Sequence, residues 1–138
     1  MHAAVPREVL ERLRAICMAW PGVREEAAWI GTRWVVRKKN FAHVLMIADG
    51  WPPAYAKAAA PVLTDAGPAC VLTFRSPLPQ ANAHAYTWAP FFRPPWFADI
   101  VGMRLEAASD WEEVASVLGA SYRMFAPGTK PAAPAGGG

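Results

Sequence analysis

The first apolar positions of the chain recur with the spacing of an α-helix. They lie three or four residues apart, with charged residues between them. Pro6 suits the first turn of a helix because its missing N–H has no intrahelical partner there, and Pro21 with Gly22 ends the pattern. The sequence therefore predicts an amphipathic helix over residues 6–19, with an apolar side made of Val9, Leu10, Leu13, Ile16, Cys17 and, just beyond it, Trp20.

Two stretches rich in β-branched and aromatic residues follow a polar turn at 24–26. They span 32–36 and 40–48, and the three residues between them are all basic, which is typical of a hairpin with a basic tip. The second stretch is apolar at nearly every position, as in a strand buried on both faces. Further strands are predicted at 70–74 and at 96–105, where Gly102 indicates a bulge.

The last apolar pattern predicts a helix from Asp110 to about Met124. Ser109 and Glu112 have the S-x-x-E spacing of a capping box, in which the serine accepts from a helix amide and the glutamate reaches back to the cap amide. This C-terminal helix has an apolar stripe of Trp111, Val114, Ala115, Leu118 and Tyr122.

The stretches 49–69 and 76–95 are rich in proline and are interpreted as long connections, the first with one short helical turn at 54–60.

Length and composition agree with one folded unit. The 138 residues are 54% hydrophobic and 12% aromatic, enough for a single core. Residues 127–138 are Pro, Ala, Gly and Thr with one Lys, and we expect them to form a disordered tail. The sequence thus predicts a single α+β domain over 1–126, with an N-terminal helix, an antiparallel sheet with long connections, and a C-terminal helix packed on one sheet face.

Several classes of protein lose support. No apolar run reaches the length of a membrane span and no secretory signal is recognisable, so we expect a cytoplasmic monomer without a membrane partner. The glycine-rich motifs of nucleotide-binding loops and the common hydrolase motifs do not occur, so neither a catalytic residue nor a cofactor is predicted. Cys17 and Cys70 lack metal-ligand spacing and are interpreted as buried thiols, and His43, inside an apolar strand, as a structural histidine.

The clearest electrostatic feature is the hairpin tip. The net charge is only +3, but Arg33, Arg37, Lys38 and Lys39 place four positive charges in seven residues with no acid among them. Such a hairpin can lie along a phosphate backbone, because basic side chains that neutralise phosphates release counterions without reading the bases. The simpler interpretation of the residues alone is a solubilising turn.

A second cluster is aromatic. It runs from Phe91 to Trp96 and includes Arg93, and Phe74-Arg75-Ser76 accompanies it. These aromatics either cover one edge of the core, which is the simpler interpretation, or line a groove for a partner. Arg75 and Arg93 can bind an anion if both point outward. The candidate interaction surface comprises Trp51, Tyr55, Phe91, Phe92 and Trp96.

In the order and spacing of several short motifs, the chain resembles the MmcQ/YjbR family of small bacterial proteins over about residues 8–127. The matching segments are Trp20-Pro21-Gly22-Val23, Lys39-Asn40-Phe41-Ala42, Val71-Leu72-Thr73-Phe74-Arg75-Ser76, Phe91-Phe92-Arg93-Pro94-Pro95-Trp96, and 110–114 with 121–127. Asn40 after the lysine and the stretch 77–86 depart from the family pattern. The resemblance implies a frataxin-like (CyaY-like) α+β fold and the family's usual assignment to DNA binding through wing-like hairpins, with no catalytic residues.

Three functions stay open. The leading hypothesis is a non-enzymatic domain that binds DNA weakly and without strong sequence preference through Arg33, Arg37, Lys38 and Lys39, helped by Arg75 and Arg93. The second is a protein-interaction or chaperone-like module that uses the aromatic loops at 51–55 and 91–97. The third is a small-molecule or anion pocket near Arg75, Arg93 and Trp96.

Overall fold

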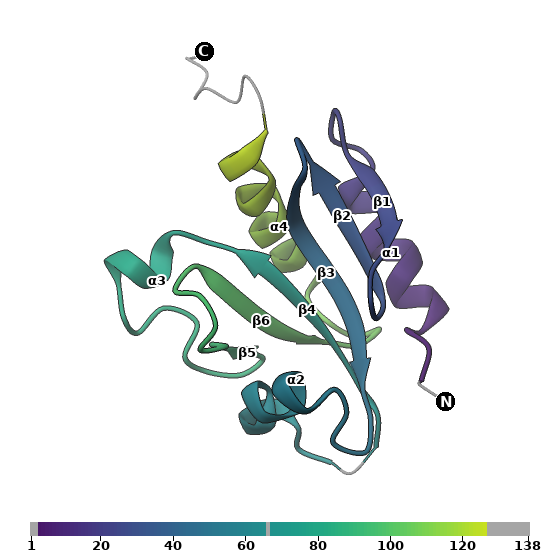
Figure 1. Ribbon diagram of the computed structural model, residues 1–138, viewed down its shortest axis with the longest axis vertical. Helices are drawn as coiled ribbons and strands as arrows, with labels where there is room; N and C mark the ends of the chain where they lie inside the picture. The colour runs from purple at the N-terminus through teal and green to yellow at the C-terminus, as the bar shows by residue number, and fades with distance from the viewer. Residues whose placement is uncertain (1–2, 66, 127–138) are drawn as a thin grey trace.

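A six-stranded antiparallel sheet forms the centre of the computed structural model, which describes residues 3–65 and 67–126 (Figure 1). The strand order is β1-β2-β3-β4-β6-β5. The expected α+β class is confirmed, while the tail predicted at 127–138 lies outside the described residues. The elements in chain order are α1 (Arg7–Cys17), β1 (Arg24–Ala27), β2 (Thr32–Val36), β3 (Lys39–Ile47), α2 (Pro53–Ala58), η1 (Ala60–Val62), β4 (Ala69–Arg75), α3 (Leu78–Ala81), β5 (Phe91–Phe92), β6 (Ile100–Leu105) and α4 (Trp111–Phe125).

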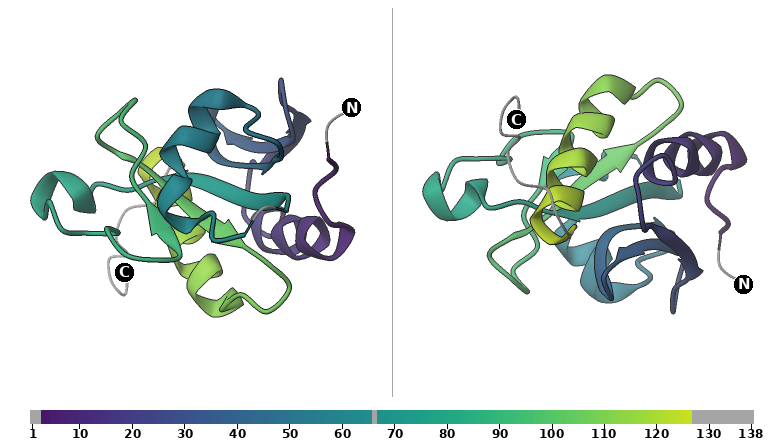
Figure 2. Two further views of the ribbon diagram at one scale, coloured as in Figure 1. Left: turned by 90° about the horizontal axis from the view of Figure 1, so that it is seen from below. Right: turned by 90° about the horizontal axis from the view of Figure 1, so that it is seen from above.

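The two faces of the sheet are covered by different elements. Helices α1 and α4 pack on one face, and α2 with η1 lies on the other, as both views of Figure 2 show. The larger core lies under α1 and α4 and includes the fully buried Leu13, Trp34 and Leu118. A smaller core lies under α2 and η1, around Leu45 and Val71. Strands β3 and β4 contribute to both cores, which is why their sequences are apolar at nearly every position.

The predicted hairpin is present as β2 and β3. Its turn consists of only Arg37 and Lys38, both with positive φ (49° and 66°), and Lys39 already belongs to β3. A bulge follows, because Trp34 pairs with Ala42 whereas Val35 pairs with Asn40. The extra residue, Phe41, is thereby directed into the larger core, where it is fully buried.

The polar turn expected at 24–26 is wrong, because these residues belong to strand β1. Its charged side chains find partners within the fold: the carboxylate of Glu25 accepts from Arg14 (2.8 and 2.9 Å) and from the indole N–H of Trp34 (3.1 Å). The guanidinium of Arg14 holds the pKa of Glu25 below its usual range. A strand whose charged side chains pair with polar groups on neighbouring elements carries no apolar alternation, so its sequence does not indicate a strand.

Gly102 does not form the expected bulge, and the last strand begins at Ile100 rather than at residue 96. Gly102 pairs regularly with Thr73 on β4 and with Phe92 on β5. The Phe92 ring occupies the space that a Cβ at Gly102 would need. The absence of a side chain at Gly102 therefore lets the Phe92 ring from β5 pack directly against the β6 backbone. Strand β5 has only two residues and lies within the connection expected at 76–95.

The start of α4 differs by one residue from the capping box. The side chain of Asp110, not of Ser109, caps the helix by accepting from the amides of Glu112 and Glu113, both at 3.2 Å. Ser109 instead accepts from the amide of Glu106 (2.8 Å) in the preceding turn. Among the described residues, no helix is both long and apolar enough to cross a membrane.

Candidate nucleic-acid interface and the pocket beside it

One end of the sheet brings together segments that are far apart in sequence. We call it the hairpin end; it comprises the 37–38 turn, the start of β3, Arg75 at the end of β4 and Ile100 at the start of β6. The last turns of α4 reach the same end, near the top of Figure 1. Ser121 on α4 fixes the arrangement, because its hydroxyl donates to the carbonyl of Phe41 (2.7 Å) and accepts from the amide of Arg75 (2.9 Å).

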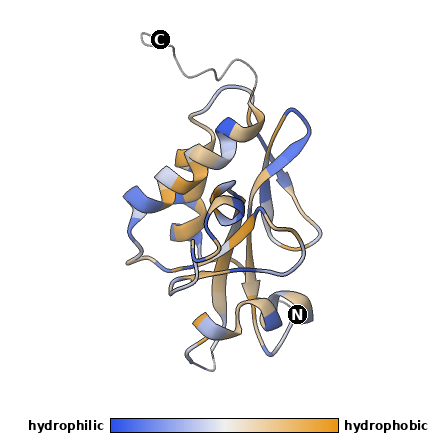
Figure 3. Cartoon of the chain, turned by 90° about the vertical axis from the view of Figure 1, so that its left-hand side faces the viewer, coloured by the Kyte–Doolittle hydropathy of each residue, from blue (hydrophilic) through white to orange (hydrophobic). Residues whose placement is uncertain are grey.

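The tip presents three cations to solvent. Arg37, Lys38 and Lys39 are exposed, and no acidic side chain within residues 3–65 and 67–126 pairs with them. Figure 3 shows this turn as a hydrophilic segment above strands that are mainly hydrophobic. Arg33 differs, because its guanidinium lies 2.9 Å from the carboxylate of Glu26 on β1. The sequence shows no acid among the four cations, but the folded sheet places one beside Arg33.

The acidic residues are segregated from this tip. Among the described residues, five of the eleven form ion pairs with arginines, namely Glu11, Glu25, Glu26, Asp65 and Asp99. The other six lie toward the opposite end of the sheet, in the first turns of α1 and α4 or beside the far ends of β3 and β6: Glu8, Asp49, Glu106, Asp110, Glu112 and Glu113. The molecule is therefore electrically polarised: three neighbouring cations without an acidic partner, Arg37, Lys38 and Lys39, lie at the hairpin end, and the unpaired acidic residues lie toward the other end.

Arg75 and Arg93 do not act as a pair. Arg75 donates to Asp99 (2.8 Å) and lies over the ring of Phe97, 5.5 Å from its centroid. Arg93 donates to the backbone carbonyls of Ala85 (3.1 Å) and Ala83 (3.5 Å) and so holds that loop. Of the two, Arg75 faces the pocket beside the hairpin.

The aromatic surface expected from the sequence divides into core and pocket residues. Phe91 and Phe92 are only 6% and 3% exposed, because β5 packs its rings against the sheet, so they are core residues rather than surface. Trp51 is half-buried, with its ring 5.5 Å from that of Trp29. The most exposed aromatic residues of the described chain are Trp29, Trp88 and Phe97. Only Phe97 lies in a loop named from the sequence, 91–97, and the candidate surface contained none of the three.

A pocket of about 240 Å³ lies beside the hairpin, between β3, β4 and the segment that follows β5. Tyr55 from α2 and Trp96 stand edge to face in its wall, with ring centroids 4.8 Å apart. The side-chain amide of Asn40, the hydroxyl of Thr73 and the indole N–H of Trp96 have no hydrogen-bond partner in the part of the chain that the structure describes. The lining residues are Asn40, Phe41, Ala42, His43, Tyr55, Thr73, Phe74, Arg75, Trp96, Phe97 and Ile100.

His43 orients Tyr55 in this wall. A carbonyl can only accept, so Nε2–H of His43 donates to the carbonyl of Ile30 (2.6 Å) and Nδ1 accepts from the Tyr55 hydroxyl (3.4 Å). Burial lowers the pKa of His43 and raises that of Tyr55, so both side chains are neutral near pH 7. This arrangement agrees with the structural role expected for His43.

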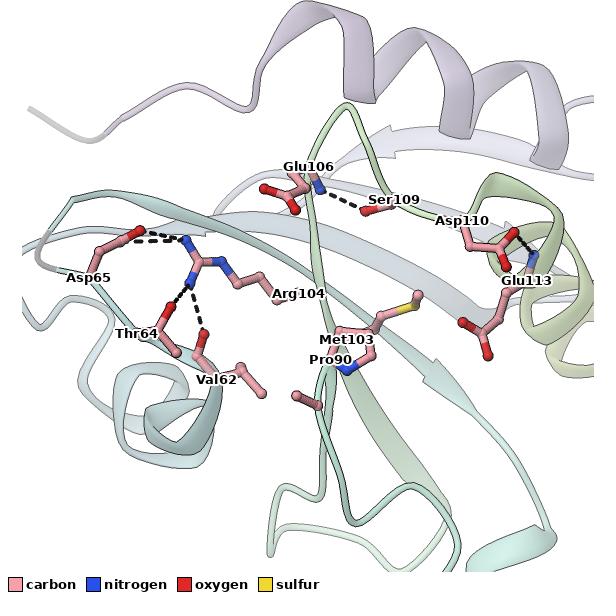
Figure 4. Close-up of a pocket in the computed structure, with 11 residues that line it drawn as sticks. Val62, Thr64, Asp65, Pro90, Met103, Arg104, Glu106, Ser109, Asp110 and Glu113 are labelled. Atoms are coloured by element: carbon pink, nitrogen blue, oxygen red, sulfur yellow. Dashed lines mark hydrogen bonds and ion pairs between the residues drawn. The ribbon is translucent and has the colours of Figure 1, made fainter.

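A cavity of about 490 Å³ lies at the opposite end and has the wrong charge for a polyanion. Figure 4 shows Arg104 directed at Asp65, Thr64 and the carbonyl of Val62. The guanidinium of Arg104 donates to that carbonyl at 2.8 Å. Glu106, Asp110 and Glu113 also line the cavity. Within residues 3–65 and 67–126, no three His, Cys, Asp or Glu side chains gather in a way that could hold a metal ion.

Both cysteines are free and buried, as expected from the sequence. Burial raises the pKa of the Cys70 thiol to about 12 and that of Cys17 further still. These thiols are therefore protonated and unreactive near pH 7.

No protein-family model matches the chain, and the comparisons found neither a curated protein nor a solved structure similar to it. The MmcQ/YjbR resemblance therefore stays a sequence-based prediction. A function for this chain has to be inferred from the charge distribution and the pocket at the hairpin end.

Proposed function

We propose that the chain binds DNA weakly and without strong sequence preference through the tip of the β2–β3 hairpin, and that it does so as a binding domain rather than as an enzyme. The observation that carries the proposal is the set of three exposed, unpaired cations, Arg37, Lys38 and Lys39, on a two-residue turn. Side chains on such a short turn lie close together, so they can contact neighbouring phosphates of one strand. Contacts to phosphates position a protein on DNA without reading its sequence.

The polarised charge distribution supports the same orientation. A polyanion is attracted to the hairpin end and repelled by the six acidic residues toward the far end that have no arginine partner. Arg33 is paired with Glu26, so its contribution to the attraction is smaller than that of the three tip residues. Arg93 serves its own loop, and we exclude it from the proposed interface.

The test is a fluorescence-anisotropy titration of labelled single-stranded and duplex DNA at two salt concentrations. The variant R37N/K38G/K39T removes the three charges and places Asn-Gly in the turn, a pair that favours the positive φ values observed there. We expect it to lose most of its affinity at low salt. Three phosphate contacts correspond to a slope of log K against log salt of roughly −2 to −3, and the variant should lose that slope.

A matched control separates location from net charge. The variant R7Q/R12Q/K57Q removes the same number of charges from exposed positions on α1 and α2, away from the hairpin turn, and should retain the affinity of the natural chain apart from a small uniform loss. The proposal fails if the natural chain does not bind DNA at low salt. It also fails if the hairpin variant binds as well as the control variant.

A further inference from the structure

The pocket beside the hairpin adjoins the proposed phosphate contacts. Asn40 follows Lys39 directly in β3 and lines the pocket, and Arg75 lines it from the neighbouring strand β4. A strand whose phosphates lie along residues 37–39 therefore runs past groups that belong to the pocket.

The size and walls of the pocket suit one planar group. Its volume, about 240 Å³, is below the roughly 300–1,000 Å³ typical of sites for drug-sized ligands. Trp96 and Tyr55 provide aromatic surface in the wall, and Phe97, 61% exposed, adds another ring at the pocket. Aromatic side chains of this kind stack with any nucleobase, because every base has a π-face.

The polar side chains of the pocket are free to form hydrogen bonds with the edge of a bound planar ring. The amide of Asn40, the hydroxyl of Thr73 and the indole N–H of Trp96 make no hydrogen bond within the described residues. Arg75 uses Nη1 for Asp99. The pocket thus combines donors and acceptors with aromatic walls, as expected for a site that receives a base rather than a phosphate alone.

We propose that the pocket receives one unpaired base of the strand held at the hairpin tip, so that the protein prefers single-stranded to duplex DNA. The inference rests on the proposed function, because the hairpin holds the strand next to the pocket. In a duplex the bases are stacked and paired, and placing one in the pocket would require it to be flipped out at a cost of a few kcal/mol. A single strand presents its bases without that cost.

The test compares three labelled DNAs with the natural chain: an oligothymidine strand, a strand of equal length in which abasic sites replace all bases, and a duplex. The first two carry the same phosphates and differ only in their bases. We expect oligothymidine to bind roughly tenfold more tightly than the abasic strand, the scale of one base–aromatic stack. Duplex should bind about as weakly as the abasic strand.

Variants identify the pocket as the origin of that difference. W96L removes the half-buried wall ring, and F97L removes the exposed one at little risk to the fold. Each should lower the affinity for oligothymidine toward that of the abasic strand and leave abasic binding unchanged. W88L, which alters an exposed tryptophan outside the pocket lining, should change neither.

The outcomes separate the two proposals. If the natural chain binds oligothymidine and the abasic strand equally, the pocket inference is wrong while hairpin binding stands. The same holds if F97L and W96L, confirmed as folded by thermal unfolding, keep the full ratio between the two strands. If neither strand binds, both proposals are wrong.

Discussion

The hydroxyl of Ser121 joins the C-terminal helix to the backbone of Phe41, eighty positions earlier in the chain, at 2.7 Å. The same oxygen accepts from the amide of Arg75 at 2.9 Å. Ser121 is fully buried, and its hydroxyl contacts β3 at the bulge, where the regular ladder is interrupted. One side chain therefore satisfies two backbone groups on different strands and attaches α4 to the end of the sheet that carries the hairpin.

Replacing this hydroxyl should be costly. S121A leaves the carbonyl of Phe41 and the amide of Arg75 without their partner, and an unsatisfied buried polar group costs about 1–3 kcal/mol. Urea unfolding should show a loss of that size. S116A, on the exposed side of the same helix, is the control and should be neutral or slightly stabilising. Equal stability of the two variants would contradict the role assigned to Ser121.

Gly102 should tolerate no side chain. A methyl group in G102A would meet the Phe92 ring, and overpacking of this kind costs roughly 1–3 kcal/mol. G67A, which meets open space, should unfold at nearly the same urea concentration as the natural chain. Adding F92L to G102A should cost less than the sum of the two single changes, because the smaller side chain relieves the overlap. Strict additivity would show that the ring is not the obstacle.

Mutations can compare the Asp110 cap observed at the start of α4 with the capping box of Ser109 and Glu112 expected from the sequence. D110A should lower the free energy of unfolding by about 0.5–2 kcal/mol, since it removes the acceptor for two helix amides. E112A should cost about 0.5 kcal/mol or less, because the carboxylate of Glu112 makes no capping contact. Both values follow from urea midpoints. A larger cost for E112A than for D110A would favour the capping box instead.

Acidification should destabilise the fold through His43. Burial lowers its pKa below 6.5 in the folded chain, so between that lower pKa and 6.5 the unfolded chain binds a proton that the folded chain does not. The free energy of unfolding therefore falls as the pH drops through this window, by at most about 1.4 kcal/mol per pH unit for one proton. H43Q should lose this part of the slope, whereas substitution of the exposed His84 should not. An unchanged slope in H43Q would exclude His43 as its source.

Elements with apolar periodicity were predictable from the sequence. The helix expected at 6–19 is α1 at Arg7–Cys17, and the strand expected at 70–74 is β4 at Ala69–Arg75. Strand β1 was missed because its side chains are stabilised by ion pairs with Arg14 and Arg33, which leave no periodic apolar trace. The turn at Arg37 and Lys38 carries no Asn-Gly signal, yet its place between two β-rich stretches identified it.

The candidate site was predictable only in part. Local sequence identified the basic tip, because Arg37, Lys38 and Lys39 are consecutive. It did not indicate that Glu26 lies beside Arg33, that Arg93 binds its own loop, or that Phe91 and Phe92 are core residues. Each of these depends on contacts between segments that the sequence keeps apart, for which a local pattern carries no information.

The sequence by itself determined the class of the fold and the position of its strongest positive charge, because periodicity and charge runs are properties of neighbouring residues. Only the tertiary structure decided which cations stay unpaired and that Asn40, Tyr55, Thr73 and Trp96 surround one pocket. It also decided that most acidic residues without an arginine partner lie toward the far end of the sheet. The physical reason is that antiparallel pairing and helix packing bring distant residues to the same end, and charge and shape complementarity arise only there.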